Sequence, residues 1–279
     1  MKSVLVTGAS GFIGQKLVAA LNDAGYKVVS LKGDVTEQQT FKRIGSPEVG
    51  FVFHLAGRTF VPDSWRDPAE FEQVNVAGTM NVLEFCRSRQ IPMTYVSAYL
   101  YGIPKKLPIS ESDEITPNNP YALSKFMAES VCKFYAEYYS VPVTIIRPFN
   151  IYGEGQKSHF LIPEIIAQVK ARAPIKLKDL NPRRDYLYVD DLVEALLLTM
   201  NPPNGCNSYN IGYGSSLSVA EIVTTIQSVV GTALPVINEN IVRDNEILDV
   251  YADISKAAEY LGWHPKTTFE QGIEAIINN

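Results

Sequence analysis

A glycine-rich loop near the start of the chain places the strongest constraint on the fold. Gly8, Gly11 and Gly14 follow the apolar run at residues 3–7 and open an amphipathic pattern at residues 12–24. In such a loop the first glycine permits a sharp turn. The second lets the backbone approach a pyrophosphate at the positive end of the helix, and the third lets helix and strand pack closely. The spacing is G-x-x-G-x-x-G, and its place between a strand and a helix predicts a dinucleotide site.

The first half of the chain alternates short β-branched runs with helical patterns. A parallel sheet with crossover helices requires this alternation, so we expect a Rossmann-type doubly wound α/β fold. The expected strands are residues 3–7, 27–31, 50–55, 93–97 and 143–147, and the expected long helices are residues 12–24, 69–89 and 121–139.

The second half differs, because prolines punctuate shorter elements. Further helices are expected near residues 190–200, 218–230, 255–261 and 269–277. The expected domains are a Rossmann domain at residues 1–150, continued by about residues 183–212, and a smaller substrate-binding lobe at residues 151–182 and 213–279.

The charge and residue composition limits the classes of molecule that the protein is expected to bind. The 279 residues carry 25 basic and 30 acidic side chains, a net charge of −5, so we expect no general affinity for nucleic acid or membranes. The glycine loop begins at Gly8, which leaves no room for a signal peptide, and no apolar run approaches about 18 residues. Three scattered cysteines argue against a disulfide framework, and three histidines without ligand spacing argue against a metal. These features predict a cytoplasmic protein that acts on a small molecule.

The end of the second expected strand bears on the choice of cofactor. NAD-selective proteins carry an acidic residue there, about 20 positions after the glycines, which binds the ribose 2′-hydroxyl. Here Lys32 and Gly33 come first and Asp34 follows. A cation therefore lies where a 2′-phosphate would sit, which favours NADP. The alternatives are a solvated loop lysine and NAD as the cofactor.

Tyr121 and Lys125 form the candidate acid–base pair. Asn119 and Pro120 suit the cap and first turn of a helix, so the two side chains lie four residues apart on one helical face. An unperturbed phenol titrates at about 10 and an unperturbed lysine at about 10.4. An ammonium beside the phenol, with a cationic nicotinamide nearby in the oxidised state, lowers the pKa of Tyr121. A chance pairing of the two residue types is the alternative.

This pair resembles the Y-x-x-x-K motif of short-chain dehydrogenases, and T-G-x-x-G-x-x-G is typical of the extended branch of that superfamily. The segment Y-V-S-A-Y-L-Y-G resembles the family's fourth-strand segment, in which Ser97 would hydrogen-bond the reacting oxygen. In related sugar-nucleotide 4,6-dehydratases the next two positions are Asp-Glu, whereas here they are Ala98 and Tyr99. The resemblance therefore implies hydride transfer, without dehydration, by Ser97, Tyr121 and Lys125.

The resemblance extends over almost the whole chain. H-L-A-G resembles the third-strand turn under the cofactor, N-V-A-G-T a helix segment, and R-P-F-N-I-Y-G the fifth-strand exit beside the nicotinamide. We expect His54 to be a core histidine and not a base. The implied cofactor-binding residues are Gly8, Ser10, Gly11, Phe12, Ile13, Gly14, Lys32, Asp34, Val35, Leu55, Ala56, Gly57, Asn75, Tyr121, Lys125, Pro148 and Phe149.

Two arginines are the candidate diphosphate-binding residues, because guanidinium groups bind phosphate oxygens bidentately. Arg184 lies in a segment that resembles the R-D-F-x-x-V-x-D of nucleotide-sugar enzymes, and Arg243 stands ten residues before Asp253, as in sugar-nucleotide epimerases. The alternative is that both arginines are surface ion-pair partners of the flanking Asp185 and Asp244. The implied substrate-binding residues are Thr59, Ser97, Tyr99, Tyr121, Asn150, His159, Phe160, Arg184 and Arg243.

Three further segments carry a narrower resemblance. They are R-T-F-V-P-D after residue 57, G-Q-K-S-H-F before residue 161, and I-K-L-K-D-L at residues 175–180. They resemble GDP-4-keto-6-deoxy-mannose reductases and neighbouring 4-ketoreductases of nucleotide-activated deoxyhexoses, which implies an NAD(P)-dependent reductase. Tyr99 stands where those reductases commonly carry Asp, so the nucleotide base stays open. A UDP-glucose 4-epimerase with retained NAD would use the same residues, and a non-catalytic dinucleotide-sensing protein is a second alternative.

The family often forms homodimers through a four-helix bundle, which residues 69–89 and 121–139 would supply. The apolar side chains that suit such an interface are Val82, Phe85, Phe126, Val131 and Phe134. The alternative is that all five belong to the core.

Overall fold

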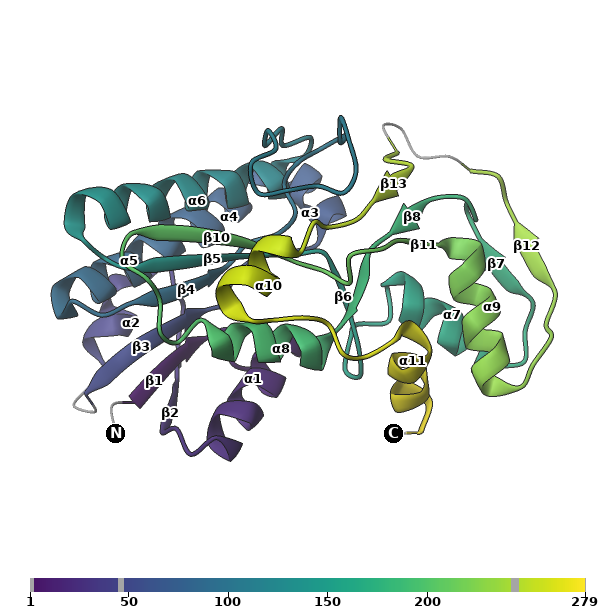
Figure 1. Cartoon of the computed structure of the whole chain (residues 1–279), viewed down its shortest axis with the longest axis horizontal. Helices are drawn as coiled ribbons and strands as arrows, with labels where there is room; N and C mark the ends of the chain where they lie inside the picture. The colour runs from purple at the N-terminus through teal and green to yellow at the C-terminus, as the bar shows by residue number, and fades with distance from the viewer. Residues whose placement is uncertain (1–2, 45–47, 242–245, 279) are drawn as a thin grey trace.

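A six-stranded sheet forms the centre of the molecule. The computed structural model describes residues 3–44, 48–241 and 246–278 (Figure 1). The strand order is β10-β5-β4-β3-β1-β2, and every neighbouring pair is parallel. The strands are β1 (Ser3–Thr7), β2 (Val28–Ser30), β3 (Val49–His54), β4 (Met93–Val96), β5 (Val143–Pro148) and β10 (Cys206–Ile211). The sheet confirms the predicted Rossmann-type α/β class.

Five of these strands match predicted runs to within one residue at either end. The sixth, β10, lies outside the predicted strands and pairs with β5, so that Cys206 lies opposite Val143 and Ile211 opposite Pro148. Its sequence, C-N-S-Y-N-I, contains two asparagines, a residue type depleted in strands. Pairing with β5 and burial of Tyr209 stabilise this strand in spite of its low propensity.

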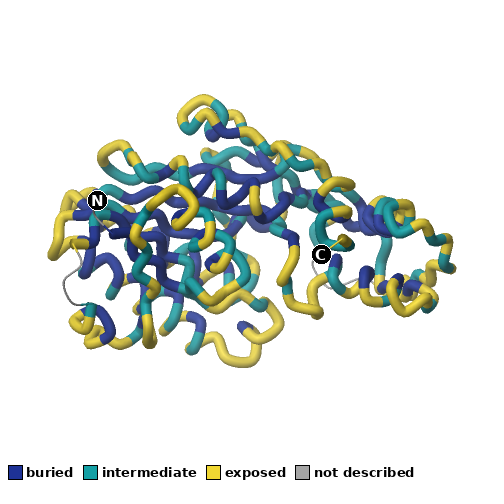
Figure 2. The backbone as a smooth tube through the Cα atoms, turned by 90° about the horizontal axis from the view of Figure 1, so that it is seen from below, coloured by how far each residue is buried: buried dark blue, intermediate teal, exposed yellow. Residues whose placement is uncertain are grey.

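Helices cover both faces of the sheet (Figure 1). The helices against the sheet are α1 (Phe12–Asp23), α2 (Gln38–Lys42), α5 (Gly78–Arg89), α6 (Pro120–Tyr139), α8 (Val189–Leu198) and α10 (Ser255–Leu261). Val82 of α5 and Cys132 of α6 pack in the core on one face, while Leu17 of α1 and Leu192 of α8 pack on the other. Figure 2 shows buried backbone through the middle of the molecule and exposed backbone around its outside. Within the described ranges, no helix is long and apolar enough to span a bilayer.

The prediction of one continuous α-helix over residues 69–89 is wrong at one turn. The segment comprises α4 (Pro68–Glu72), a π-helical turn η1 (Gln73–Ala77) and α5, with the short α3 (Val61–Arg66) before it. The hydroxyl of Thr79 donates to the carbonyl of Asn75 at 2.6 Å and so satisfies a backbone group of the π turn. Such turns are rare and leave no mark on hydrophobic periodicity.

The C-terminal half builds a second, smaller group of elements beside the sheet (Figure 1). Its strands are β6 (Asn150–Tyr152), β7 (Ile175–Leu177), β8 (Arg183–Arg184), β9 (Tyr186–Tyr188), β11 (Leu217–Ser218), β12 (Val236–Asn238) and β13 (Asp249–Val250). Its helices are α7 (Leu161–Lys170), α9 (Val219–Val230) and α11 (Phe269–Asn278). A capping box between Ser218 and Glu221 starts α9, and Ile165, Ile222 and Ile273 meet in the core of this region.

Candidate active site

The glycine loop between β1 and α1 is a tight turn. Gly8 has a φ of +70°, and a Cβ on it would lie 2.7 Å from the backbone nitrogen of Ala56. A Cβ on Gly14 would lie 2.1 Å from the carbonyl oxygen of Gly8, so neither position accepts a side chain. Gly11 is the N-cap of α1, and its amide donates to the Gly8 carbonyl at 3.0 Å. Because Gly11 provides no capping side chain, the first amides of α1 suit an anionic ligand.

The residues around this turn differ in exposure. Ser10 is exposed, whereas Phe12 and Ile13 are half-buried and pack toward the C-terminal region. A Cβ on Gly153 would lie 3.4 Å from the ring of Phe12, so the loop after β6 passes close to the start of α1. The glycine loop therefore lies where the sheet meets the smaller region.

The segment that follows β3 lies next to the glycine loop and forms a second side of the candidate site. The amides of Leu55 and Ala56 donate to the carbonyl and hydroxyl of Thr7, at 3.2 and 3.1 Å. A Cβ on Gly57 would lie 2.8 Å from the Asn75 side-chain oxygen, so this glycine allows a close approach. Asn75 itself is buried.

Asn75 joins three segments. Its Oδ1 accepts from the amide of Arg58 at 2.8 Å, and its Nδ2 donates to the Arg58 carbonyl at 3.1 Å and to Ser124 Oγ at 2.9 Å. Ser124 lies on α6 between Tyr121 and Lys125. Asn75 thereby holds the β3 exit against the helix that carries the acid–base pair.

His54 is a core histidine, as expected. Its Nδ1 lies 2.7 Å from Thr7 Oγ1 and its Nε2 lies 2.9 Å from Thr79 Oγ1. Burial, and to a lesser extent the charge of Lys125, lowers its pKa to about 3. The ring is therefore neutral near pH 7 and supports the floor of the site.

The exit of β2 has an exposed cation and a carboxylate that is already hydrogen-bonded. Lys32 and Asp34 are exposed, and Asp34 Oδ1 accepts from the amide of Thr36 at 2.8 Å. Val35 is buried, and a Cβ on Gly78 would lie 2.8 Å from its side chain. Asp34 thus stabilises its own turn, four residues beyond the end of β2.

Ser97, Tyr121 and Lys125 lie where β4 ends and α6 begins. The Asn119 side chain caps α6 by accepting from the amide of Ala122 at 2.8 Å. Lys125 Nζ donates to the carbonyl of Val96 at 2.8 Å, directly before Ser97. The hydroxyl of Ser97 is buried and has no hydrogen-bond partner within the described part of the chain. A buried hydroxyl without a partner is costly, so this one suits a ligand oxygen.

Burial dominates the electrostatics of the acid–base pair. It lowers the pKa of Lys125 to about 8, and the nearby Glu129 partly offsets this effect. Burial, with a contribution from Tyr99, raises the pKa of Tyr121. In the protein alone the phenol is therefore protonated at neutral pH. The expected lowering of the Tyr121 pKa belongs to the state with oxidised cofactor and stays a prediction.

The exit of β5 presents an aromatic pair. Pro148 ends the strand, and the ring of Phe149 stacks on Tyr99 with centroids 5.3 Å apart. The amide and the side chain of Asn150 both donate to the carbonyl of Asp185, at 3.0 and 3.1 Å. Tyr99 thus joins the β4 and β5 exits, and Asn150 joins the sheet to the smaller region.

Two segments that are remote in sequence meet through aromatic rings. The ring of Phe60, after β3, lies 4.4 Å from that of His159, which lies 4.6 Å from that of Phe160. Thr59 is exposed beside this contact. The structure therefore brings together the two loops that the sequence assigned to the substrate side.

Arg184 has partners other than the expected ones. Its guanidinium pairs with Glu246 and donates to the carbonyls of Arg183 and Ile247, at 2.8 and 2.6 Å. Asp185 does not pair with it. Arg243 and Asp244 lie outside the described residues, so the structure does not test the second diphosphate arginine.

Asp185 organises the neighbouring backbone. Its carboxylate accepts from the amides of Tyr213, Gly214 and Ala252, at 2.6, 3.0 and 3.1 Å. Burial raises its pKa to about 6, and these hydrogen bonds oppose the rise. Its fixed position therefore aligns the loop after β10 with β8 and with the segment after β13.

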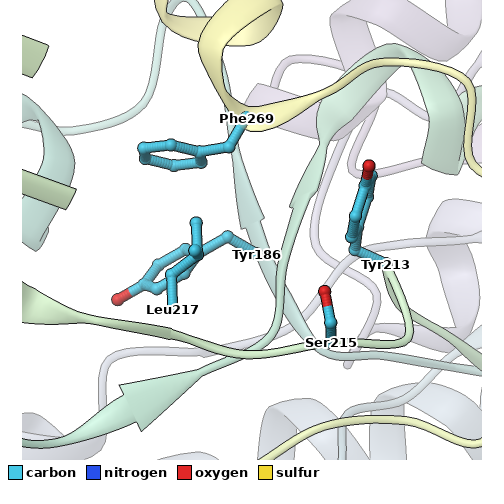
Figure 3. Close-up of a pocket in the computed structure, with 5 residues that line it drawn as sticks. All are labelled: Tyr186, Tyr213, Ser215, Leu217 and Phe269. Atoms are coloured by element: carbon cyan, nitrogen blue, oxygen red, sulfur yellow. The ribbon is translucent and has the colours of Figure 1, made fainter. Parts of the chain in front are cut away.

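Leu217, which pairs with Arg184 between β11 and β8, lines a cavity of about 200 Å³ that the sequence analysis missed. It is lined by Tyr186, Tyr213, Ser215, Leu217 and Phe269, whose side chains surround a common space in Figure 3. The lining residues come from three separate segments, so only Tyr186, next to the R-R-D motif, carried a signal. Among the described residues, no group of three or more His, Cys, Asp or Glu side chains is arranged to hold a metal ion.

Comparison with known proteins agrees with this geometry. Residues 4–212 match the family model of the NAD dependent epimerase/dehydratase family. The chain belongs to this family. It is 30% identical to a GDP-6-deoxy-D-mannose reductase of Pseudomonas aeruginosa, over 99% of this chain and 96% of that protein. It is also 30% identical to a UDP-glucose 4-epimerase of Mycolicibacterium smegmatis, over 98% of this chain and 96% of that protein. The structure of RMD from Pseudomonas aeruginosa with NADPH has a TM-score of 0.93 and 30% identity, and the match covers 100% and 98% of the two chains.

As a member of the NAD dependent epimerase/dehydratase family, the chain is an NAD(P)-dependent enzyme of the nucleotide-sugar type. Its residues fit a dinucleotide on three structural grounds. Gly8 and Gly14 let the turn close tightly where a Cβ would clash with the backbone, Gly11 leaves the first amides of α1 uncapped, and the Ser97 hydroxyl lacks a partner among the described residues. These features surround the end of the sheet at which open α/β folds bind ligands.

Proposed function

We propose that this enzyme is an NADPH-dependent 4-ketoreductase of a nucleoside-diphosphate 4-keto-6-deoxyhexose. The observation that carries the proposal is the exit of β2, where Lys32 is exposed and the Asp34 carboxylate is bonded to the amide of Thr36. A cation there favours the 2′-phosphate of NADPH, whereas an acid at the strand end would favour NAD. An exchangeable, reducing cofactor suits net reduction of a carbonyl.

The proposed chemistry assigns one role to each residue of the trio. NADPH, when bound, supplies a hydride for the carbonyl carbon C4. Ser97 donates a hydrogen bond to the C4 oxygen, which its unpartnered hydroxyl suits. Tyr121 donates its phenolic proton to that oxygen, and the raised pKa keeps this proton on the phenol until it is needed. Lys125 has a pKa of about 8 and is an ammonium at neutral pH. It would hold the cofactor ribose, and its positive charge would stabilise the phenolate that Tyr121 becomes after it gives up its proton.

The same proposal assigns the smaller region to the substrate, with residues 151–182 and 213–279 as the substrate-binding lobe. Arg184 would release Glu246 to bind the diphosphate, and Arg243 is proposed as the second arginine that binds it. The cavity of about 200 Å³, with aromatic walls at Tyr186 and Phe269, suits the nucleoside end. Thr59, His159 and Phe160 would then face the sugar.

The test mixes the purified protein with NADPH and GDP-4-keto-6-deoxymannose and follows the absorbance of NADPH. We expect one NADPH oxidised for each sugar reduced, and no oxidation by Tyr121→Phe under the same conditions. A protein that binds NADPH but oxidises none with any 4-keto-6-deoxyhexose nucleotide would contradict the proposal.

A 4-epimerase with retained NAD is the second candidate. The 30% identity to a UDP-glucose 4-epimerase favours it. This candidate predicts interconversion of UDP-glucose and UDP-galactose with no net use of cofactor. The two candidates therefore differ both in the substrate that is turned over and in whether the cofactor is consumed.

We also propose that the protein is a cytoplasmic homodimer. The outer faces of α5 and α6 carry exposed apolar side chains, and exposed apolar patches mark interfaces. The exposed residues are Met80, Leu123, Met127, Phe134 and Tyr138. Val82 and Phe85, by contrast, are buried in the core. Sedimentation of the wild type as a dimer, and of Phe134→Lys as a monomer with normal NADPH affinity, would support a four-helix interface.

A further inference from the structure

A buried ion pair lies directly behind the acid–base pair. Glu129 is on α6, one turn after Lys125, and its side chain is 0% exposed. Arg147 of β5 is 2% exposed and binds it through two hydrogen bonds, from Nε to Oε1 at 2.9 Å and from Nη2 to Oε2 at 2.6 Å. Removing two charges from water is expensive, and apolar residues of similar size often serve stability as well. Stability alone therefore does not explain the pair. Its position does, because it holds the Glu129 carboxylate one helical turn from Lys125.

Further hydrogen bonds fix the position of Arg147. Its Nη1 donates to the hydroxyl of Tyr101 at 2.8 Å, and that hydroxyl donates to Asn210 Oδ1 at 2.6 Å. The amide of Asn210 in turn donates to Glu111 Oε1 at 2.7 Å. All three guanidinium nitrogens of Arg147 are bonded, so the Glu129 carboxylate is held from β5, β10 and the loop before α6.

Among the described titratable groups around Lys125, Glu129 is the one that can carry a negative charge near pH 7. The described titratable groups that face Lys125 are Glu129, Cys132 and Tyr121 of α6, Tyr95 of β4 and His54 of β3. Burial raises the pKa of Cys132, Tyr95 and Tyr121 and lowers that of His54 to about 3. Those four groups are neutral near pH 7. On the far side of Glu129 lies the cation of Arg147, with Tyr101 and Glu111 behind it.

We propose that Glu129 and Arg147 are positioning residues that hold one carboxylate a helical turn from Lys125 and so keep its buried ammonium charged for the cofactor. Arg147 orients this carboxylate through two hydrogen bonds and, as its buried counter-ion, stabilises its negative charge. The inference rests on the proposed role of Lys125 in holding the cofactor. It does not depend on which sugar is reduced.

The test is the pH dependence of NADPH binding, measured by the fluorescence of the bound cofactor. Binding weakens as pH rises and Lys125 loses its proton, which defines an alkaline limb. Glu129→Gln removes the attracting charge, so the limb moves to lower pH by about one pH unit or more. Arg147→Met leaves the buried carboxylate without its counter-ion and its fixed orientation, so less negative charge faces Lys125 and the limb also moves to lower pH. A purely structural pair would weaken binding in both variants without moving the limb.

Matched variants complete the test. Glu137 is an exposed carboxylate two turns farther along α6, and Glu137→Gln is expected to keep the wild-type limb. Glu129→Asp keeps the charge, so its limb stays in place even if its melting temperature falls. Should Glu129→Gln fail to fold, a limb at lower pH in Arg147→Met and an unchanged one in Glu129→Asp support the proposal. Any other pattern overturns it.

The binding titration needs no sugar. Displaced limbs without ketoreduction would therefore refute only the proposed function, whereas wild-type limbs in both variants would refute only the positioning role. If the wild type binds NADPH with no alkaline limb, Lys125 does not act through its charge and the inference is wrong.

Discussion

The neutral histidine under the site predicts a specific loss of stability in acid. His54 is fully buried between Thr7 and Thr79, and its pKa is lowered to about 3 from the 6.5 of an exposed ring. The unfolded chain therefore takes up a proton at a pH at which the folded chain does not. Its contribution to stability is complete above about pH 6.5 and is lost as pH falls toward about pH 3.

The size of the effect follows from the two pKa values. Between about pH 7.5 and about pH 5, proton uptake by the unfolded chain at His54 reduces the free energy of unfolding by about 2 kcal/mol. In His54→Gln the amide offers a donor and an acceptor to the two threonines but takes up no proton. The free energy of unfolding of this variant should therefore fall by about 2 kcal/mol less than that of the wild type between about pH 7.5 and about pH 5. This difference does not depend on how stable the variant is at about pH 7.5.

Urea unfolding followed by circular dichroism at both pH values measures the difference. Asp185 acts in the opposite direction, because its raised pKa of about 6 stabilises the fold by roughly 1 kcal/mol as pH falls over the same range. Both proteins share that contribution, so it cancels in the comparison. His264→Gln, at an exposed histidine, is the control and should behave as the wild type. Equal losses in the wild type and His54→Gln would refute the reasoning.

Three further predictions concern the site. Tyr121→Phe should lower kcat by about a hundredfold to ten-thousandfold, because it removes the proton donor; a smaller loss in steady-state kinetics would exclude Tyr121 as the acid. Gly14→Ala should destabilise the fold by about 1–3 kcal/mol in urea unfolding and weaken cofactor binding, since its Cβ would lie 2.1 Å from the Gly8 carbonyl oxygen. A normal transition midpoint would show that α1 can move away from β1. Lys32→Glu should change the ratio of NADPH to NADH affinity at least about tenfold toward NADH; an unchanged ratio would mean that this lysine is only a solvated loop residue.

The sequence was most informative where the structure is local. The glycine loop, the Asn119 cap and the four-residue spacing of Tyr121 and Lys125 depend on neighbours along the chain, and all lie as predicted. The last strand of the sheet, β10, depends instead on pairing with β5, and its asparagines gave no strand signal.

Side-chain partners across the fold were not predictable in the same way. The partner of Arg184 is Glu246, far along the chain, and not the adjacent Asp185, whose carboxylate binds three backbone amides. The lining of the cavity near Tyr186 likewise comes from segments that only the folded chain brings together. Charge pattern alone does not distinguish an ion pair from an anion site, because both use the same arginine.

Because of the π turn at Gln73–Ala77, the packing of this helix depends more on the number of residues in it than on their identity. A π turn holds about one residue more than an α turn, which rotates everything after it by about 100° around the axis. Deleting one residue there would restore regular α-helical hydrogen bonding, but it would rotate Val82 and Phe85 away from the sheet or pull Asn75 out of its bonds to Arg58 and Ser124. Insertions and deletions in this stretch should therefore be far less tolerated than substitutions on its exposed side.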